Sequence, residues 1–304
     1  CPPRPPSRPG RADMTARRVR ALTPQALRRM PLPPPGEDKE ERGRALVIGG
    51  SRHVPGAARL PAEPALRPGA GKLQVATAAS VATGMALAVP EALVLGLAED
   101  RRGEIARGHR DVDAALRACA AVAIGPGMRD GAGTHALVQR VLALSRCTVV
   151  LDAGALTADL DALPAGRCVL TPHAGEMAAI TGASKEQIQT TPADHARALA
   201  LRTRSVVILK GADTHVADAD GGLWRHRGGV PGLGTSGSGD TLAGLIVGFA
   251  ARGADPLQAA LWGVVVHAQA GRALARSVGS LGFLAREIPP QVPGILDRLQ
   301  RGAR

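Results

Sequence analysis

Residues 232–249 read GLGTSGSGDTLAGLIVGF, a glycine-rich turn followed by an apolar run. Within the run, Leu242, Leu245, Ile246 and Phe249 recur at the spacing of one helical face, which predicts an amphipathic helix. A glycine-rich turn that opens a helix is a common unit of α/β proteins, in which the turn carries chemistry and the helix covers a sheet.

The start of this predicted helix is a candidate anion site. Gly237, Ser238 and Gly239 lie at its amino terminus, where unpaired N–H groups and the helix dipole favour a phosphate. Asp240 follows them directly, and two interpretations stay open for it. It could cap the helix, or it could act as a base that takes a proton from a substrate hydroxyl during phosphoryl transfer.

The rest of the chain predicts the fold around this helix. Short β-branched runs alternate with helical patterns such as those at 136–145 and 194–202. The predicted strands lie at residues 44–50, 71–77, 120–127, 147–153, 168–172 and 205–211. Continuous apolar strands separated by helices are typical of a mostly parallel sheet with helices on both faces, whose ligands bind beyond the carboxyl ends of the strands.

Composition limits the other classes of function. The chain of 304 residues has a net charge of +12, but its first thirty residues hold eight arginines against one aspartate. Residues 1–36, rich in Pro and Arg, are predicted to be a disordered tail, and residues 37–304 a single domain. Aromatic residues make up 1% of the chain, which argues against a binder of single-stranded nucleic acid.

The cysteines and the apolar segments predict the cellular location of the protein. Cys1, Cys119, Cys147 and Cys168 form no CxxC pair, and the three in or beside apolar segments are predicted to be small core residues, as expected in the reducing cytoplasm. The most apolar segment, 85–98, is interrupted by a proline and a glutamate, so no membrane span is predicted.

Two further segments carry candidate site residues at strand ends. The predicted strand at 205–211 ends in Lys210 and Gly211, which could face nucleotide phosphates or form a solvated hairpin with a second strand from Thr214. In LTPHAGE, residues 170–176, His173 could hydrogen-bond a polar substrate. Glu176 could do the same or cap the following helix.

Six blocks together resemble a known family. They are IGGSRHVPGAARL (48–60), AIGPGM (123–128), LDAGAL (151–156), LTPHAGEMAAITG (170–182), VILKGADT (207–214) and PGLGTSGSGDTLAG (231–244). Their order resembles that in ADP/ATP-dependent NAD(P)H-hydrate dehydratases, which belong to the ribokinase-like superfamily. The resemblance runs from about residue 44 to 295. It implies repair of hydrated NADH or NADPH, by dehydration coupled to cleavage of ADP or ATP.

The resemblance also implies roles for particular residues. Asp240 would activate the hydroxyl of the hydrate. The substrate-binding residues would be Ala57, Gly127, His173 and Asp240. The nucleotide-binding residues would be Lys210, Gly211, Ala212, Asp213, Thr214, Gly237, Ser238 and Gly239.

Cofactors and partners follow from the same resemblance. Magnesium would neutralise phosphate charge, with ligands that the sequence does not name. ADP is the expected co-substrate, ATP being the alternative, and relatives are often homotetramers. A separate epimerase would convert the R form of the hydrate. Two other hypotheses stay open: a ribokinase-like kinase of a vitamin-precursor hydroxyl, and a non-enzymatic nucleic-acid-binding protein that uses its arginine-rich tail.

Overall fold

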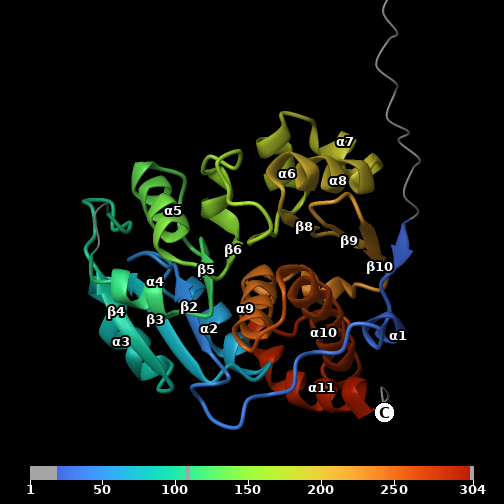
Figure 1. Ribbon diagram of the computed structural model, residues 1–304, viewed down its shortest axis with the longest axis horizontal. Coiled ribbons are helices and arrows are strands. Elements are labelled where there is room, and N and C mark those ends of the chain that lie inside the picture. Colours follow the sequence, from blue (N-terminus) through green and yellow to red (C-terminus); the bar gives the residue numbers. More distant parts are fainter. Residues whose placement is uncertain (1–18, 107–109, 302–304) are drawn as a thin grey trace, which may run out of the picture.

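The computed structural model describes residues 19–106 and 110–301, and within them ten strands form one sheet (Figure 1). The strand order is β1-β10-β9-β8-β7-β6-β5-β2-β3-β4. Neighbours from β8 to β4 pair in parallel, whereas β9 runs antiparallel to both β8 and β10. The strands are β1 (Arg20–Ala21), β2 (Arg44–Ile48), β3 (Lys72–Ala78), β4 (Ala92–Leu97), β5 (Ala121–Ile124), β6 (Thr148–Leu151), β7 (Cys168–Leu170), β8 (Val206–Leu209), β9 (Thr214–Ala217) and β10 (Leu223–His226).

Helices cover both faces of the sheet, as the pattern of apolar strands predicts. One face packs against α2, α9 and α10, and the other against α4, α5 and α8 (Figure 1). The α-helices are α1 (Pro24–Leu27), α2 (Gly56–Leu66), α3 (Ala82–Ala88), α4 (Asp113–Ala118), α5 (Ala132–Leu144), α6 (Ala174–Thr181), α7 (Lys185–Thr190), α8 (Pro192–Thr203), α9 (Ser238–Ala251), α10 (Pro256–Ser277) and α11 (Val292–Arg301). The predicted fold class is therefore confirmed.

All six predicted strands are present, and the structure adds others. Strand β4 lies inside the apolar segment 85–98, where Pro90 and Glu91 end one helix and precede an edge strand. Strands β9 and β10 are four residues each, and β9 begins at Thr214 as the hairpin interpretation expected. No helix in residues 19–106 and 110–301 is long and apolar enough to cross a membrane.

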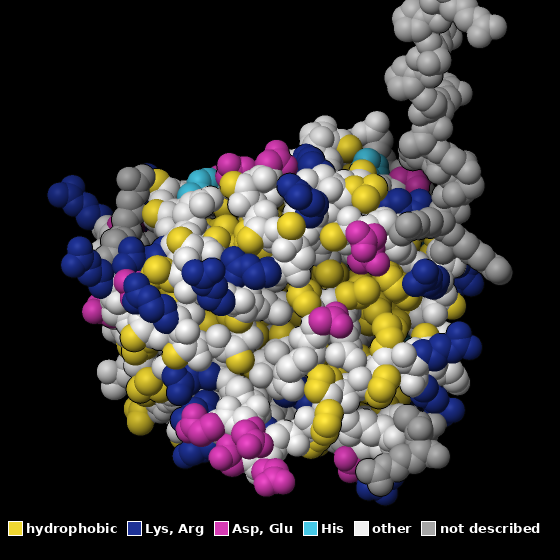
Figure 2. Space-filling view, viewed as in Figure 1, with side chains coloured by type: hydrophobic (Ala, Val, Ile, Leu, Met, Phe, Trp, Pro, Cys, Tyr) yellow, Lys and Arg dark blue, Asp and Glu magenta, His cyan; other side chains and the backbone are white. Residues whose placement is uncertain are grey.

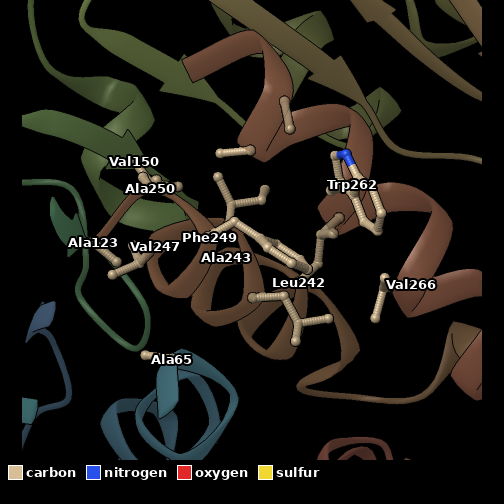
Figure 3. Packing of buried hydrophobic residues seen from close by; sticks show 14 of the residues in the cluster. Ala65, Ala123, Val150, Leu242, Ala243, Val247, Phe249, Ala250, Trp262 and Val266 are labelled. Atoms are coloured by element: carbon tan, nitrogen blue, oxygen red, sulfur yellow. The ribbon is translucent and has the colours of Figure 1, made fainter. Parts of the chain in front are cut away.

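Helix α9 differs from the predicted amphipathic helix because it is buried on every side. Its residues from Thr241 to Ala251 are all buried, so the helix forms the centre of one core and has no solvent face. Figure 3 shows Leu242 and Phe249 packed beside Trp262 of α10, with ring centroids of Phe249 and Trp262 6.1 Å apart. A Cβ at Gly244 would collide with the carbonyl oxygen of Pro61 on α2. Glycine there lets the two helix backbones touch.

The predicted disorder of residues 1–36 is wrong for residues 19–36, and residues 1–18 lie outside the described residues. Strand β1 pairs with β10, and the short helix α1 follows it. Leu22 and Leu27 are each 1% exposed, because they pack into the core that contains α9. Trp262 donates its indole N–H to the carbonyl oxygen of Met30 at 2.8 Å. Burial of these apolar side chains orders the segment, although its proline-rich composition predicts disorder.

Candidate active site

A cleft of about 920 Å³ opens at the carboxyl edge of the sheet, where the parallel strands of an α/β fold present their ligands. One end of the cleft is polar: Asp152 after β6, Glu176 on α6, and Lys210 after β8 meet the first turn of α9 there. The lining also includes apolar side chains, namely Val230, Leu233, Val264 and Ala268. A cleft with both charged and apolar walls fits a ligand that combines phosphate groups with a base.

Lys210 is the centre of the charges at the polar end. Its Nζ lies 3.0 Å from Oδ1 of Asp152 and 3.7 Å from Oε2 of Glu176. Asp152 is 1% exposed and also accepts a hydrogen bond of 2.6 Å from the hydroxyl of Thr171. A buried carboxylate held by two donors fixes the ammonium in place. Burial lowers the pKa of Lys210, but the attraction of Asp152 and Glu176 outweighs it, so the pKa is raised overall and Lys210 stays charged.

Asp240 is the third residue of α9, and its carboxyl group faces the same cleft. The N-cap position belongs to Gly237 with a φ of +85°, so the capping interpretation of Asp240 is wrong. Burial and the nearby carboxylates of Asp152 and Glu176 raise the pKa of Asp240 to about 7, against the opposing effect of Lys210. A carboxyl group that titrates near neutral pH can exchange a proton with a substrate at working pH.

The turn from Gly237 to Gly239 places backbone rather than side chains beside this cluster. A Cβ at Gly239 would lie 3.2 Å from Nζ of Lys210, so glycine leaves the approach between the ammonium and the turn open. The first amides of α9 have no partner within the helix and carry the positive end of its dipole. The start of α9 and the ammonium group of Lys210 together form a pocket suited to an anion, at the turn where the sequence predicts an anion site.

His267 on α10 supports the same turn from behind. Its Nε2 lies 3.0 Å from the carbonyl oxygen of Ser238 and 3.1 Å from the Ser238 hydroxyl. The carbonyl can only accept, so Nε2 carries the proton and donates it. Burial lowers the pKa of His267 to about 4, which keeps the ring neutral at physiological pH. The turn is therefore held by a neutral donor that adds no charge to the cleft.

His173 lines the cleft and also begins α6. Its Nδ1 accepts hydrogen bonds from the backbone N–H groups of Gly175 at 3.0 Å and Glu176 at 3.1 Å. The Glu176 carboxylate accepts in return from the N–H of His173 at 2.7 Å, so the capping interpretation of Glu176 is confirmed. Because Nδ1 accepts, the proton of the neutral ring lies on Nε2, which is 3.6 Å from Oε1 of Glu176.

The segment from Lys210 to Thr214 connects β8 to β9, so the hairpin interpretation is confirmed, while contact with nucleotide phosphates stays a prediction. Lys210, Gly211, Ala212 and Thr214 line the cleft. Asp213 does not: it faces a second cavity of about 890 Å³ on the side of α7 and α8, where Arg225 lies 4.0 Å from its carboxylate. The cleft therefore brings together four of the five residues of this segment with Gly237, Ser238 and Gly239, which makes seven of the eight predicted nucleotide-binding residues.

Ala57 and Gly127 lie outside the walls of the cleft but beside each other. Each follows a parallel strand, β2 and β5 respectively, at the same sheet edge. A Cβ at Gly127 would come within 2.5 Å of the Ala57 Cβ, so the two backbones are in close contact. One turn along α2, Leu60 reaches Gly237. This pair therefore borders the turn before α9, while its contact with substrate stays a prediction.

Two site residues have no assigned role in the sequence analysis. Asp152 stands directly after a strand in LDAGAL, which is the signal that could have singled it out as a site residue. His267 is a lone histidine in a long helix, and only the packing of α10 against α9 reveals its contact with Ser238. No group of three or more His, Cys, Asp or Glu residues in the described part of the chain could enclose a metal ion.

A sheet of this topology with a glycine turn, a helix and a carboxylate at its carboxyl edge defines a ribokinase-like protein. A ribokinase-like superfamily protein from Enterococcus faecalis matches with a TM-score of 0.78 and 26% identity, over 93% of this chain and 97% of its own. The family model for NAD(P)H-hydrate dehydratase matches residues 45–293. The chain belongs to the NAD(P)H-hydrate dehydratase family.

Two relatives are similar over nearly their whole length. An ADP-dependent (S)-NAD(P)H-hydrate dehydratase of Xanthomonas campestris is 67% identical over 290 residues, which covers 95% of this chain and 100% of the relative. The crystal structure of the ADP/ATP-dependent NAD(P)H-hydrate dehydratase from Bacillus subtilis, co-crystallised with ATP and Mg²⁺, matches with a TM-score of 0.80 and 30% identity. The match covers 93% of this chain and 100% of that one.

Proposed function

We propose that this protein catalyses the ADP-dependent dehydration of the S-epimer of NAD(P)H hydrate to NAD(P)H, releasing AMP and phosphate. The observation that carries the proposal is the meeting of Asp240, whose pKa is about 7, with Lys210 and the amino terminus of α9 in one cleft. Membership of the family and the 67% identity to the Xanthomonas relative support the choice of substrate.

The proposed reaction needs a base and an anion pocket because hydroxide is a poor leaving group. Asp240 takes the proton of the ring hydroxyl as the hydroxyl oxygen attacks the terminal phosphorus of ADP, and AMP leaves. The phosphate ester then breaks at its carbon–oxygen bond as the ring loses a proton from the neighbouring carbon. The products are NAD(P)H and inorganic phosphate, and the water of the hydrate ends in the phosphate.

Each neighbour of Asp240 has a proposed part in this chemistry. Lys210 and the turn Gly237–Gly239 hold the phosphoryl group that is transferred, since both supply positive charge at one place. Asp152 is a positioning residue that fixes Lys210 at 3.0 Å. His173 donates from Nε2 to the hydrate, and Ala57 and Gly127 border the same side. Gly211, Ala212 and Thr214 contact the AMP portion, and Asp213 acts on it only indirectly.

Magnesium fits the cleft as a partner of the nucleotide. Carboxylate oxygens are ligands that Mg²⁺ prefers, and Asp152 and Glu176 are the carboxylates beside Lys210. Because the described residues form no metal-enclosing group, we expect phosphate oxygens and water to supply most of the ligands. Bound there, Mg²⁺ would neutralise phosphate charge.

The wider setting is part of the proposal. We propose a cytoplasmic enzyme, because its substrates are cytoplasmic metabolites, and a homotetramer, by resemblance to the family. A separate epimerase would supply the S form, and residues 37–304 would act as one domain. Lys and Arg side chains on the face in Figure 2 lie in several groups among acidic ones, an arrangement unlike the continuous basic stripe of a nucleic-acid binder.

The test is to incubate the protein with NADPH hydrate, Mg²⁺ and either ADP or ATP, and to follow the absorbance of the reduced nicotinamide. We expect absorbance to return with ADP and AMP to appear in equal amount. Asp240→Asn should remove the activity, whereas Asp297→Asn, at an exposed site on α11, should retain it. A stable phosphorylated product from a vitamin-precursor alcohol, with no return of absorbance, would instead establish the hydroxyl-kinase hypothesis.

A further inference from the structure

Two cysteines outside the cleft lie within reach of each other. Cys119 ends α4, and Cys147 lies one residue before β6. Their Sγ atoms are 3.4 Å apart, and both thiols are free. The chain between them includes β5, which is the sheet neighbour of β6, so sheet pairing brings the two cysteines together across 28 residues of sequence.

The two thiols have different surroundings, which shift their pKa values in opposite directions. Cys147 is half-buried, and both the hydrogen bond between the two thiols and the guanidinium of Arg167 lower the pKa of Cys147. The bond to Cys147 and burial raise the pKa of Cys119. Arg167 is held in place, since it donates to the carbonyl oxygen of Ser145 at 2.7 Å. Cys147 is therefore the more acidic thiol of the pair, and Cys119 the less acidic one.

Cys168 provides an internal comparison. It is fully buried in β7, and burial raises the pKa of its thiol to about 12. Among the described residues, the one hydrogen bond between cysteine thiols joins Cys119 to Cys147 and does not include Cys168. Thiolate character and exposure decide which cysteines react with oxidants, so Cys147 should react while Cys168 should not.

We propose that Cys119 and Cys147 are a redox modification site, which a hydroperoxide converts to an intramolecular disulfide and a thiol reductant restores. The Cys147 thiolate attacks one oxygen of the peroxide, the O–O bond breaks, and hydroxide leaves, giving a sulfenic acid. The Cys119 thiol then attacks that sulfur, the S–O bond breaks, and water leaves. In total, two thiols and one hydrogen peroxide give one disulfide and two waters.

The position of the pair indicates what the disulfide would do. A disulfide bond is about 2.0 Å long, so the two sulfurs must approach by about 1.4 Å. The bond would join the segments that precede β5 and β6 at the amino edge of the sheet, opposite the cleft. The carboxyl ends of the same strands lead to Gly125 and Asp152. The disulfide would tie together two strands that carry site residues, without placing sulfur in the site.

The experiment uses full-length protein with Cys1→Ser, so that the terminal cysteine cannot form other bonds. After treatment with hydrogen peroxide, peptide mapping without reductant should show one linked peptide pair that contains Cys119 and Cys147. Dithiothreitol should release it. Cys168→Ser should form the same pair. Cys119→Ser should accumulate a sulfenic acid on Cys147, trapped with dimedone at least ~10-fold faster than any product at Cys168.

Other outcomes would overturn the proposal. Both cysteines could stay free, or could end as separate sulfinic acids, at peroxide concentrations that oxidise glutathione completely. A link from either cysteine to Cys168 would equally contradict it. Because the peptide map is made on chains that retain both thiols, these outcomes are decisive even if a cysteine variant fails to fold. None of them depends on the dehydratase activity.

Discussion

Replacing Asp240 by Asn should lower the turnover and raise the free energy of unfolding. The amide keeps the shape of the carboxyl group but cannot take a proton, so turnover should fall by ~10²–10⁴-fold, the usual contribution of a positioned base. Nucleotide binding should change little, because Lys210 and the turn at Gly237–Gly239 remain. In the wild type, kcat/KM should rise through about pH 7 as Asp240 ionises, and this rise should disappear in the variant.

The stability gain can be worked out from the pKa. A shift from 3.8 to about 7 corresponds to a penalty of at most about 4 kcal/mol on the ionised carboxylate. The side chain keeps partial access to solvent, so we expect ~1–3 kcal/mol. Because the pKa is higher in the folded than in the unfolded chain, the wild type loses stability as the pH rises from about 4 to about 7. The gain of the variant should therefore be larger at pH 8 than at pH 5.

Urea unfolding of both proteins at pH 5 and pH 8 measures this difference, with Asp297→Asn as the control. A variant that is destabilised, or one whose gain in stability is the same at both pH values, would refute the idea that the folded structure disfavours the ionised form of Asp240. Full turnover by Asp240→Asn would refute its role as the base. The two readouts are independent, since one reports the free energy of unfolding and the other a rate.

Three further predictions concern the structure around the site. Because burial lowers the pKa of His267 to about 4, the wild type should lose stability as the pH falls from about 6.5 towards 4; His267→Gln should show a smaller loss in urea unfolding at pH 7 and 4.5. Gly237→Ala should lower the free energy of unfolding by ~1–3 kcal/mol and weaken ADP binding in calorimetry, since φ of Gly237 is +85° and a Cβ would overlap a leucine of α2. As the control, Gly234→Ala should leave both quantities nearly unchanged, because the space around Gly234 is open. Deleting residues 1–18 should leave the melting temperature unchanged, whereas deleting 1–36 should cost ~3–6 kcal/mol, because two fully buried leucines are lost; equal melting temperatures for the two truncations would contradict the observed packing.

The fold was predictable because its decisive signals are local. Each central strand is a short apolar run that ends in a turn, and each covering helix has its own periodicity. Strand β4 was not predicted because the residues before Pro90 and those after it are both apolar. The sequence therefore shows no clear boundary between the end of α3 and the start of β4. The segment 19–36 escaped prediction because its order comes from Leu22 and Leu27 packing against a distant helix, which composition does not reveal.

The candidate site was predictable where the residue type and the strand end coincide. Lys210 and His173 follow strands and Asp240 follows a glycine-rich turn at the carboxyl edge of the sheet, and the structure gathers all three in one cleft. The burial of Asp240 and its charged neighbours depend on strand order, because β6 and β8 are separated by β7 in the sheet but by more than fifty residues in sequence. A sequence pattern carries no signal for that distance.

The charges in the cleft explain why a base and a phosphate can share one place. Asp152, Glu176 and Asp240 together would carry three negative charges against the single positive charge of Lys210. An ADP phosphate adds further negative charge, which would raise the pKa of Asp240 and keep its proton on. Lys210, the amino terminus of α9 and a bound cation oppose that effect. We therefore expect binding of the nucleotide with its cation to set the pKa of Asp240, so that its carboxylate would be free to act as the base once the phosphoryl acceptor and donor are both bound.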